Sequence, residues 1–187
     1  WLFKVDRSEL VFIIPAKNEE KTIENVILAV SKYGNVIVIN DASTDSTISI
    51  IKKFDVNLIN NINNIGYHNS ILKGLKEAIK LNYKLAITFD ADNQHLEENK
   101  KLFLEKFELD YDFVIGERSF FNRFSEKILS IFSKFFLNSK DILSGMKGYN
   151  LESIKYENLI FKKNTFCAEL AYILIKKNTE LLIYQSK

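Results

Sequence analysis

Two carboxylates, Asp90 and Asp92, stand two residues apart directly after the apolar run 85–89. The run is short, rich in strand-forming residues and ends abruptly in charge, so it predicts a buried strand. Because side chains at i and i+2 of an extended chain share a face, both carboxylates can converge just past the strand end. A hard divalent cation needs such oxygen ligands, and Mg²⁺ or Mn²⁺ held this way usually also carries substrate phosphates. The alternative is structural, because Asp, Asn and Gln before a helix can cap its free backbone N–H groups.

Short apolar runs alternate with helical patterns over the first two thirds of the chain. Strands are predicted at residues 11–14, 36–39, 56–59, 85–89 and 113–115. Apolar residues at three- and four-residue spacing predict amphipathic helices at residues 19–32, 44–54, 68–81 and 96–107. This alternation implies an α/β fold with a mostly parallel central sheet and helices on both faces.

Polar residues gather where three of the predicted strands end, at residues 15–19, 40–45 and 90–94. Ligands of parallel α/β sheets bind beyond the carboxyl ends of the strands, so the three clusters predict one site. Two interpretations of the second cluster can hold together. Ser43 or Thr44 can cap the following helix, and Asp41 can accept hydrogen bonds from a base or ribose. Gly66, in the loop after the third strand, permits a turn or a close backbone approach.

The composition bounds the class of protein. A length of 187 residues predicts one domain over 1–187, and 47% hydrophobic with 27% charged residues is ordinary for a soluble globular protein. A net charge of +2, without a Lys/Arg run, argues against nucleic acid as a partner. Cys167 is the single cysteine, which excludes an internal disulfide and fits a reducing compartment. Since no apolar run approaches ~20 residues and no signal-peptide pattern opens the sequence, we expect a cytoplasmic protein.

The ordered motifs resemble those of the family 2 glycosyltransferases of GT-A fold, in particular the dolichyl-phosphate mannosyl- and glucosyltransferase branch. The resemblance covers roughly residues 9–185. Its matching segments are, in order, residues 13–20, 39–47, 64–67, 89–95, 115–118 and 141–149, followed by Glu169. The resemblance implies a single catalytic domain that binds a nucleoside diphosphate sugar, GDP- or UDP-linked.

The resemblance also implies roles for individual residues. The nucleotide would be bound by Pro15, Asn18, Glu19, Asp41, Gly66 and Asp90. Asp90 would lie near the diphosphate, and Asp92 with Gln94 would hold Mg²⁺ or Mn²⁺. Arg118 and Lys147 would meet phosphate charge, and the catalytic group would be Asp90, Asp92 and Arg118.

The sequence departs from the family pattern at two places. Asn40 stands where many members have Asp, but the following Asp41 keeps the acid in second place. Met146-Lys147 stands where Phe-Arg is common. Lysine keeps the charge but lacks the bidentate fork of arginine, which makes the phosphate role of Lys147 less secure.

The expected reaction is a metal-dependent transfer with inversion at the anomeric carbon. A polyprenyl phosphate is the favoured acceptor, because a phosphate monoester with a second pKa near 6 is already an anionic nucleophile at neutral pH. His68 and His95 are interpreted as loop or capping residues rather than as general bases. The alternative is the same fold with a saccharide or glycolipid hydroxyl as acceptor.

The phenylalanine-rich segment from Ser119 to Lys140 carries basic residues among apolar ones at helical spacing. Such a helix can lie in a membrane interface, which would make the protein peripheral on the cytoplasmic membrane face. The alternative is an ordinary core-facing helix.

Two other classes of protein are less consistent with the sequence. A nucleotidyltransferase would carry a Gly- and Arg-rich loop near the first strand, and residues 15–20 contain neither residue type. An inert, partner-binding subunit would not need the intact set Asp41, Asp90, Asp92 and Gln94.

Overall fold

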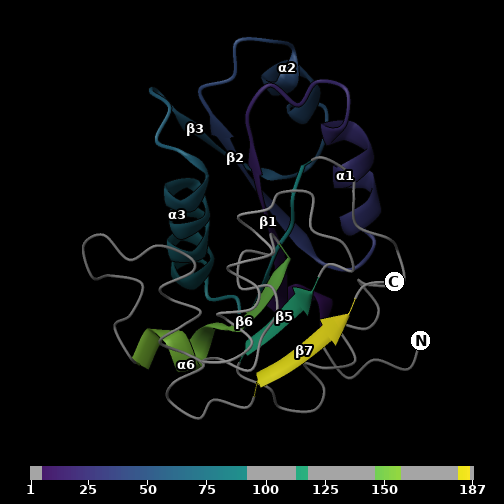
Figure 1. Cartoon of the computed structure of the whole chain (residues 1–187). Helices are drawn as coiled ribbons and strands as arrows, with labels where there is room; N and C mark the ends of the chain where they lie inside the picture. The colour runs from purple at the N-terminus through teal and green to yellow at the C-terminus, as the bar shows by residue number, and fades with distance from the viewer. Residues whose placement is uncertain (1–5, 92–112, 118–145, 157–180, 186–187) are drawn as a thin grey trace.

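The computed structural model describes residues 6–91, 113–117, 146–156 and 181–185. These residues build a seven-stranded sheet in the order β3-β2-β1-β4-β6-β5-β7 (Figure 1). The strands are β1 (Leu10–Ala16), β2 (Asn35–Asp41), β3 (Asn57–Asn61), β4 (Leu85–Thr88), β5 (Phe113–Glu117), β6 (Lys147–Asn150) and β7 (Leu181–Gln185). All five predicted strands are therefore present, with bounds shifted by at most two residues.

The sheet is mostly parallel, as predicted. In its first half β3, β2, β1 and β4 run parallel, and Ile13 of β1 lies beside Ile37 of β2 and Thr88 of β4. β6 runs antiparallel to both β4 and β5, and β5 runs parallel to β7. The sequence did not predict β6 or β7. β6 is a four-residue strand with polar ends and a glycine, so its sequence has no strand-like hydrophobic pattern. It is a strand because it pairs with β4 and β5.

Four helices and one 3₁₀ turn accompany the strands in the described residues. They are η1 (Arg7–Glu9), α1 (Ile23–Val30), α2 (Thr47–Ile51), α3 (Tyr67–Lys80) and α6 (Leu151–Tyr156). The helix predicted at 96–107 lies outside the described residues. None of the helices in the described ranges is long and apolar enough to span a bilayer.

Helices lie on both faces of the sheet, which confirms the predicted layers (Figure 1). β1 is buried along its whole length, and its residues alternate between the two cores. Val11 and Ile13 pack with α3 on one face, whereas Phe12 and Ile14 pack with α1 and α2 on the other. A strand buried on both faces is typical of a central parallel strand, and here it sets the carboxyl end of β1 in the middle of the sheet.

Helix α3 packs close to the sheet at Gly74. The buried residues of α3 are Ser70, Ile71, Gly74, Leu75, Ala78 and Ile79, a stripe with helical spacing. A Cβ added at Gly74 would run into Cγ2 of Ile13 and lie 2.8 Å from Cδ1 of Ile39. The missing side chain therefore lets α3 approach β1 and β2, and this contact sets the position of the turn at the start of α3.

Candidate active site

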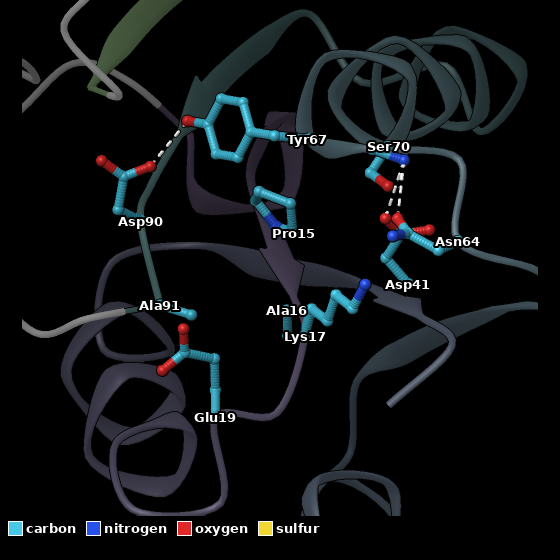
Figure 2. A pocket seen from close by; sticks show the side chains of 11 residues that line it. Pro15, Ala16, Lys17, Glu19, Asp41, Asn64, Tyr67, Ser70, Asp90 and Ala91 are labelled. Atoms are coloured by element: carbon cyan, nitrogen blue, oxygen red, sulfur yellow. Dashed lines mark hydrogen bonds between the residues drawn. The ribbon is translucent and has the colours of Figure 1, made fainter. Parts of the chain in front are cut away.

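A pocket of about 440 Å³ opens at the carboxyl ends of β1, β2 and β4. Its lining residues are Pro15, Ala16, Lys17, Glu19, Asp41, Asn64, Gly66, Tyr67, Ser70, Asp90 and Ala91. Figure 2 shows Asp41 and Asp90 on opposite sides of this pocket, with Tyr67 and Pro15 between them. The strand ends, together with the turn between β3 and α3, thus bring together the polar clusters that the sequence placed at one edge.

The carboxylate of Asp41 is held by the turn between β3 and α3. Its Oδ1 accepts hydrogen bonds from the backbone N–H of Ile65, at 2.8 Å, and from Nδ2 of Asn61, at 3.0 Å. Its Oδ2 accepts the backbone N–H of Gly66 at 2.9 Å. Gly66 has a φ of +85°, a conformation that side chains with a Cβ rarely adopt, so the turn needs glycine here.

Asp41 is buried but ionised. Burial raises the pKa of this carboxyl, but the three hydrogen bonds and the charge of Lys17 outweigh that effect and set the pKa below its ordinary value of 3.8. Figure 2 shows the Lys17 side chain extending towards Asp41. One end of the pocket therefore presents a fixed anionic acceptor beside a lysine ammonium group.

Asp90 occupies the other end of the pocket, immediately after β4. Its Oδ1 accepts a hydrogen bond of 2.6 Å from the phenol of Tyr67, the first residue of α3 (Figure 2). A bond this short to a charged acceptor is stronger than a neutral one and orients the carboxylate. The sequence places Tyr67 in the matching segment 64–67 but predicts no role for it. Its position directly after the loop glycine Gly66 is the local feature that could have marked it as a pocket residue.

Asn18 lies beside the pocket rather than in its lining. Its Oδ1 accepts the backbone N–H of Thr44 at 2.9 Å, and its own N–H donates to Oγ of Ser43 at 3.0 Å. Asn18 thus ties the β1–α1 loop (residues 17–22) to the β2–α2 loop (residues 42–46). Its φ of +57° is a left-handed conformation that asparagine tolerates better than most residues.

Further hydrogen bonds join the same two loops. The backbone N–H of Glu19 donates to Oγ1 of Thr47 at 2.8 Å, and the backbone N–H of Ser46 donates to Oε2 of Glu20 at 3.1 Å. The predicted cap by Ser43 or Thr44 is wrong. Both contact Asn18, and Asp45 accepts the backbone N–H of Thr47 at 3.0 Å. The joined loops place Glu19 in the pocket wall.

Lys147 is buried on β6, opposite Thr88 of β4. The hydroxyl of Thr88 accepts the backbone N–H of Lys147 at 3.1 Å. Burial, and next the charge of Lys147, lower the pKa of His68, the second residue of α3. Lys147 therefore places positive charge near the start of α3, although it does not line the pocket.

Three of the predicted site residues, Asp92, Gln94 and Arg118, lie outside the described residues. Among the residues that are described, no cluster of three His, Cys, Asp or Glu side chains could hold a metal by itself. The pocket nevertheless fits a hard cation in the chemistry of its donors. Its lining contains the carboxylates of Glu19 and Asp90, which are oxygen donors of the type that a hard cation prefers, and Asp90 stands two positions before the predicted metal ligand Asp92.

Comparison with known proteins identifies a family. The sequence profile of "Glycosyl transferase family 2" matches residues 11–160. The UDP-N-acetylglucosamine–dolichyl-phosphate N-acetylglucosaminyltransferase of Methanococcus voltae is 30% identical to this chain over an alignment of 203 positions. The alignment covers 90% of this chain and 80% of that protein. The region matched by the family profile, residues 11–160, contains all the lining residues of the pocket.

Solved structures confirm the fold. Staphylococcus aureus TarS 1–349 superimposes with a TM-score of 0.70 at 19% identity, over 96% of this chain and 58% of that chain. Mycobacterium tuberculosis glucosyl-3-phosphoglycerate synthase, in complex with Mn²⁺, UDP and glucosyl-3-phosphoglycerate, gives a TM-score of 0.73 at 16% identity, over 96% of this chain and 70% of that chain. The sheet, the pocket at its carboxyl edge and the family match together lead to one assignment: this chain is a glycosyltransferase of GT-A fold and belongs to glycosyl transferase family 2.

Proposed function

We propose that this chain transfers a sugar from a nucleoside diphosphate sugar to a polyprenyl phosphate of the dolichyl type. The observation that carries the proposal is the pocket with Asp41 at one end and Asp90 at the other. A nucleoside diphosphate sugar is elongated. It needs hydrogen-bond acceptors for its base or ribose at one end, and groups that position and balance its charged diphosphate at the other. The Methanococcus voltae relative, whose name specifies dolichyl phosphate, supports the acceptor.

The donor lies along the pocket. Its base or ribose meets Asp41, and its diphosphate lies towards Asp90. Pro15, Glu19 and Gly66 form the walls between these ends. Asn18 contributes indirectly, because it holds the loop that carries Glu19 against the neighbouring loop.

Mg²⁺ or Mn²⁺ is the proposed cofactor, with Asp92 and Gln94 as its ligands. When bound, a divalent cation neutralises the negative charge that develops on a departing diphosphate. The side chains of Arg118 and Lys147 add positive charge for the same leaving group. The complex of the mycobacterial structure with Mn²⁺ and UDP supports this use of a cation.

The reaction is a direct displacement. An oxygen of the acceptor phosphate forms a bond to the anomeric carbon as the bond between that carbon and the diphosphate oxygen breaks, and the nucleoside diphosphate leaves. The configuration at the anomeric carbon inverts. Because the second pKa of a phosphate monoester lies near 6, the acceptor oxygen is anionic at neutral pH without a general base.

A lipid acceptor requires contact with a membrane surface. We propose that the segment from Ser119 to Lys140 makes this contact, with its phenylalanines in the acyl boundary and its basic residues at the headgroups. The protein would then be peripheral on the cytoplasmic face of the membrane.

Transfer assays test the proposal directly. The purified protein is incubated with UDP-N-acetylglucosamine, UDP-glucose or GDP-mannose, with Mg²⁺ or Mn²⁺, and with or without a short polyprenyl phosphate. We expect one donor to be consumed only when lipid and metal are both present, and chelation to abolish the turnover. Asp90→Asn is expected to lose at least tenfold in turnover, whereas Asn63→Ala, an exposed change in the neighbouring loop, keeps it.

Two results would contradict the proposal in different ways. Donor consumption with a saccharide or glycolipid hydroxyl, but not with a polyprenyl phosphate, would replace the acceptor and keep the donor. Failure of any nucleotide sugar to bind would contradict the pocket assignment itself.

A further inference from the structure

Most of the hydrogen-bond acceptor sites of the Asp41 carboxylate are occupied by donors of the protein itself. An ionised carboxylate offers about four lone-pair sites, two on each oxygen. Both sites of Oδ1 are taken, by the backbone N–H of Ile65 and by Nδ2 of Asn61. One site of Oδ2 is taken by the backbone N–H of Gly66. Counting the donors of the described residues, one acceptor site of Asp41, on Oδ2, therefore remains for a ligand.

Asn61, at the end of β3, cannot turn its amide away from Asp41. Lys73, in the second turn of α3, donates from Nζ to Oδ1 of Asn61 at 2.6 Å, and an ammonium group can only donate. The amide nitrogen therefore points the other way, to Asp41 at 3.0 Å and to Oγ of Ser70 at 3.5 Å. Asn61 is only 7% exposed and both polar atoms of its side chain are hydrogen-bonded, so water cannot readily replace this donor.

We propose that Asn61, oriented by Lys73, is a specificity-determining residue that restricts Asp41 to a single N–H of the donor base and so selects uracil over guanine. This inference rests on the proposed function, because it takes Asp41 as the contact for the base. Uracil presents one ring N–H between two carbonyl groups. Guanine presents two adjacent donors, N1–H and N2–H, which would pair with both oxygens of a carboxylate. With Oδ1 filled, the second donor of guanine finds no acceptor on Asp41.

Lys17 completes the base end without discriminating between these bases. Its ammonium group lies on the same side of the pocket as Asp41 and, as an ammonium group, could only donate hydrogen bonds to a base. Both uracil and guanine have a carbonyl group beside the ring N–H that could accept one. The choice between them therefore falls to the number of free acceptor sites on Asp41, which Asn61 sets.

The first test is the affinity of the unmodified protein for UDP and for GDP, by titration calorimetry with Mg²⁺. We expect UDP to bind about tenfold more tightly than GDP. A donor left without its partner against a charged group costs about this factor or more. Both probes carry the same diphosphate, so their difference reports on the base.

The second test removes the donor of Asn61. Asn61→Leu has a similar size and no N–H, which opens the second site of Oδ1. We expect the preference for UDP over GDP to fall at least threefold. The matched control is Asn63→Leu, an exposed position two residues away with the same change, and it should leave the preference unchanged. Lys73→Met is expected to act in the same direction but more weakly, because Asp41 still attracts the amide NH₂.

The outcomes separate this inference from the proposed function. Equal or tighter binding of GDP by the unmodified protein overturns the inference but leaves a nucleotide-sugar transferase. A preference for UDP that Asn61→Leu does not reduce overturns the role of Asn61. Thermal melting shows whether Asn61→Leu folds. If it does not, the preference for UDP over GDP is measured with Asn61→Ala and Lys73→Met instead. Failure of both nucleotides to bind contradicts the proposed function itself.

Discussion

Three consecutive residues hold the two carboxylates of the pocket. The backbone N–H groups of Ile65 and Gly66 bind Asp41, and the phenol of Tyr67 binds Asp90. The separation of the two acidic ends therefore depends on the conformation of one turn. At the residue scale, this makes Tyr67 a positioning residue for Asp90 and Gly66 the residue that permits the turn.

Replacing Tyr67 by Phe removes the hydrogen bond to Asp90 and keeps the ring. The lost bond is charge-assisted, so we expect kcat to fall by about tenfold. The KM for the nucleotide sugar should change by less than threefold, because the base end of the pocket is untouched. Steady-state kinetics measures both parameters.

Tyr83→Phe is the matched control for this change. Tyr83 lies just beyond the other end of α3, beside a separate small cavity. It should leave kcat unaltered. A Tyr67→Phe variant with unchanged kcat, or with a loss confined to KM, would contradict the positioning of Asp90 by Tyr67.

The lowered pKa of Asp41 gives a pH-dependent contribution to stability. A carboxyl whose pKa is lower in the folded protein stabilises it at pH values above the unfolded pKa, near 3.8. This contribution is lost as the pH falls through the lower, folded value. Asp41→Asn lacks it, so the difference in unfolding free energy between the two proteins should be constant above about pH 5 and shrink below pH 4. Urea denaturation from pH 7 to pH 3 measures this difference, and a pH-independent difference would contradict the ionised state of Asp41.

At the scale of elements, the distance between α3 and the sheet positions the turn that holds both carboxylates. Gly74 permits this distance, because Ile13 and Ile39 fill the space where a side chain would lie. The second positioning device is the pair of joined loops after β1 and β2. The backbone N–H groups of Asn18, Glu19 and Glu20 donate to side chains of the β2–α2 segment. α1 begins at Ile23 and not at the predicted residue 19.

Gly74→Ala tests the close approach of α3. Alanine favours a helix by about 1 kcal/mol over glycine, but overpacking of a core costs about 1–3 kcal/mol. Since the added Cβ would meet two sheet residues, we expect a net loss of about 1–2 kcal/mol in unfolding free energy, measured by urea denaturation. Lys76→Ala, on the same helix, is the control and should change this quantity by less than about 0.5 kcal/mol. A more stable Gly74→Ala variant would show that α3 can move away from the sheet without cost.

At the scale of the whole molecule, strand ends far apart in the sequence meet at one edge. β1 lies between β2 and β4, so residues 15–19, 40–45 and 90 become neighbours although up to 75 positions separate them. A ligand that fills this edge contacts residues at the ends of β1, β2 and β4 and at the start of α3 together. Binding should therefore stabilise the entire fold.

Thermal melting measures this stabilisation. A ligand at 100 times its dissociation constant adds about 2.7 kcal/mol, and for a protein of this size that corresponds to about 5–10 °C in Tm. We expect UDP with Mn²⁺ to give such a shift and a chelator to remove most of it. The same concentration of Mn²⁺ alone is the control. A Tm that does not respond to UDP with metal would contradict the nucleotide pocket.

The sequence by itself determined the α/β class, the five strands of its alternating pattern, and the edge at which the polar clusters meet. These features follow from local periodicity and from the rule that parallel strands end at a common edge. The polar clusters and the family resemblance together predicted Pro15, Glu19, Asp41, Gly66 and Asp90 as site residues, and all five line one pocket. Pro15 and Asp90 directly follow predicted strands, Glu19 and Asp41 stand in the polar clusters after such strands, and Gly66 breaks a loop. Each residue therefore carries a local signal.

Only the tertiary structure decided how these residues are held. The bond from Tyr67 to Asp90 spans 23 positions, and that from Asn61 to Asp41 spans 20. No local pattern encodes such partners, because they depend on how far α3 and β3 lie from their neighbours in the sheet. The short strand β6 is likewise defined by its antiparallel partners β4 and β5 rather than by its own sequence. Hydrogen bonds between distant residues are satisfied only once the chain is packed, which is why they are properties of the fold.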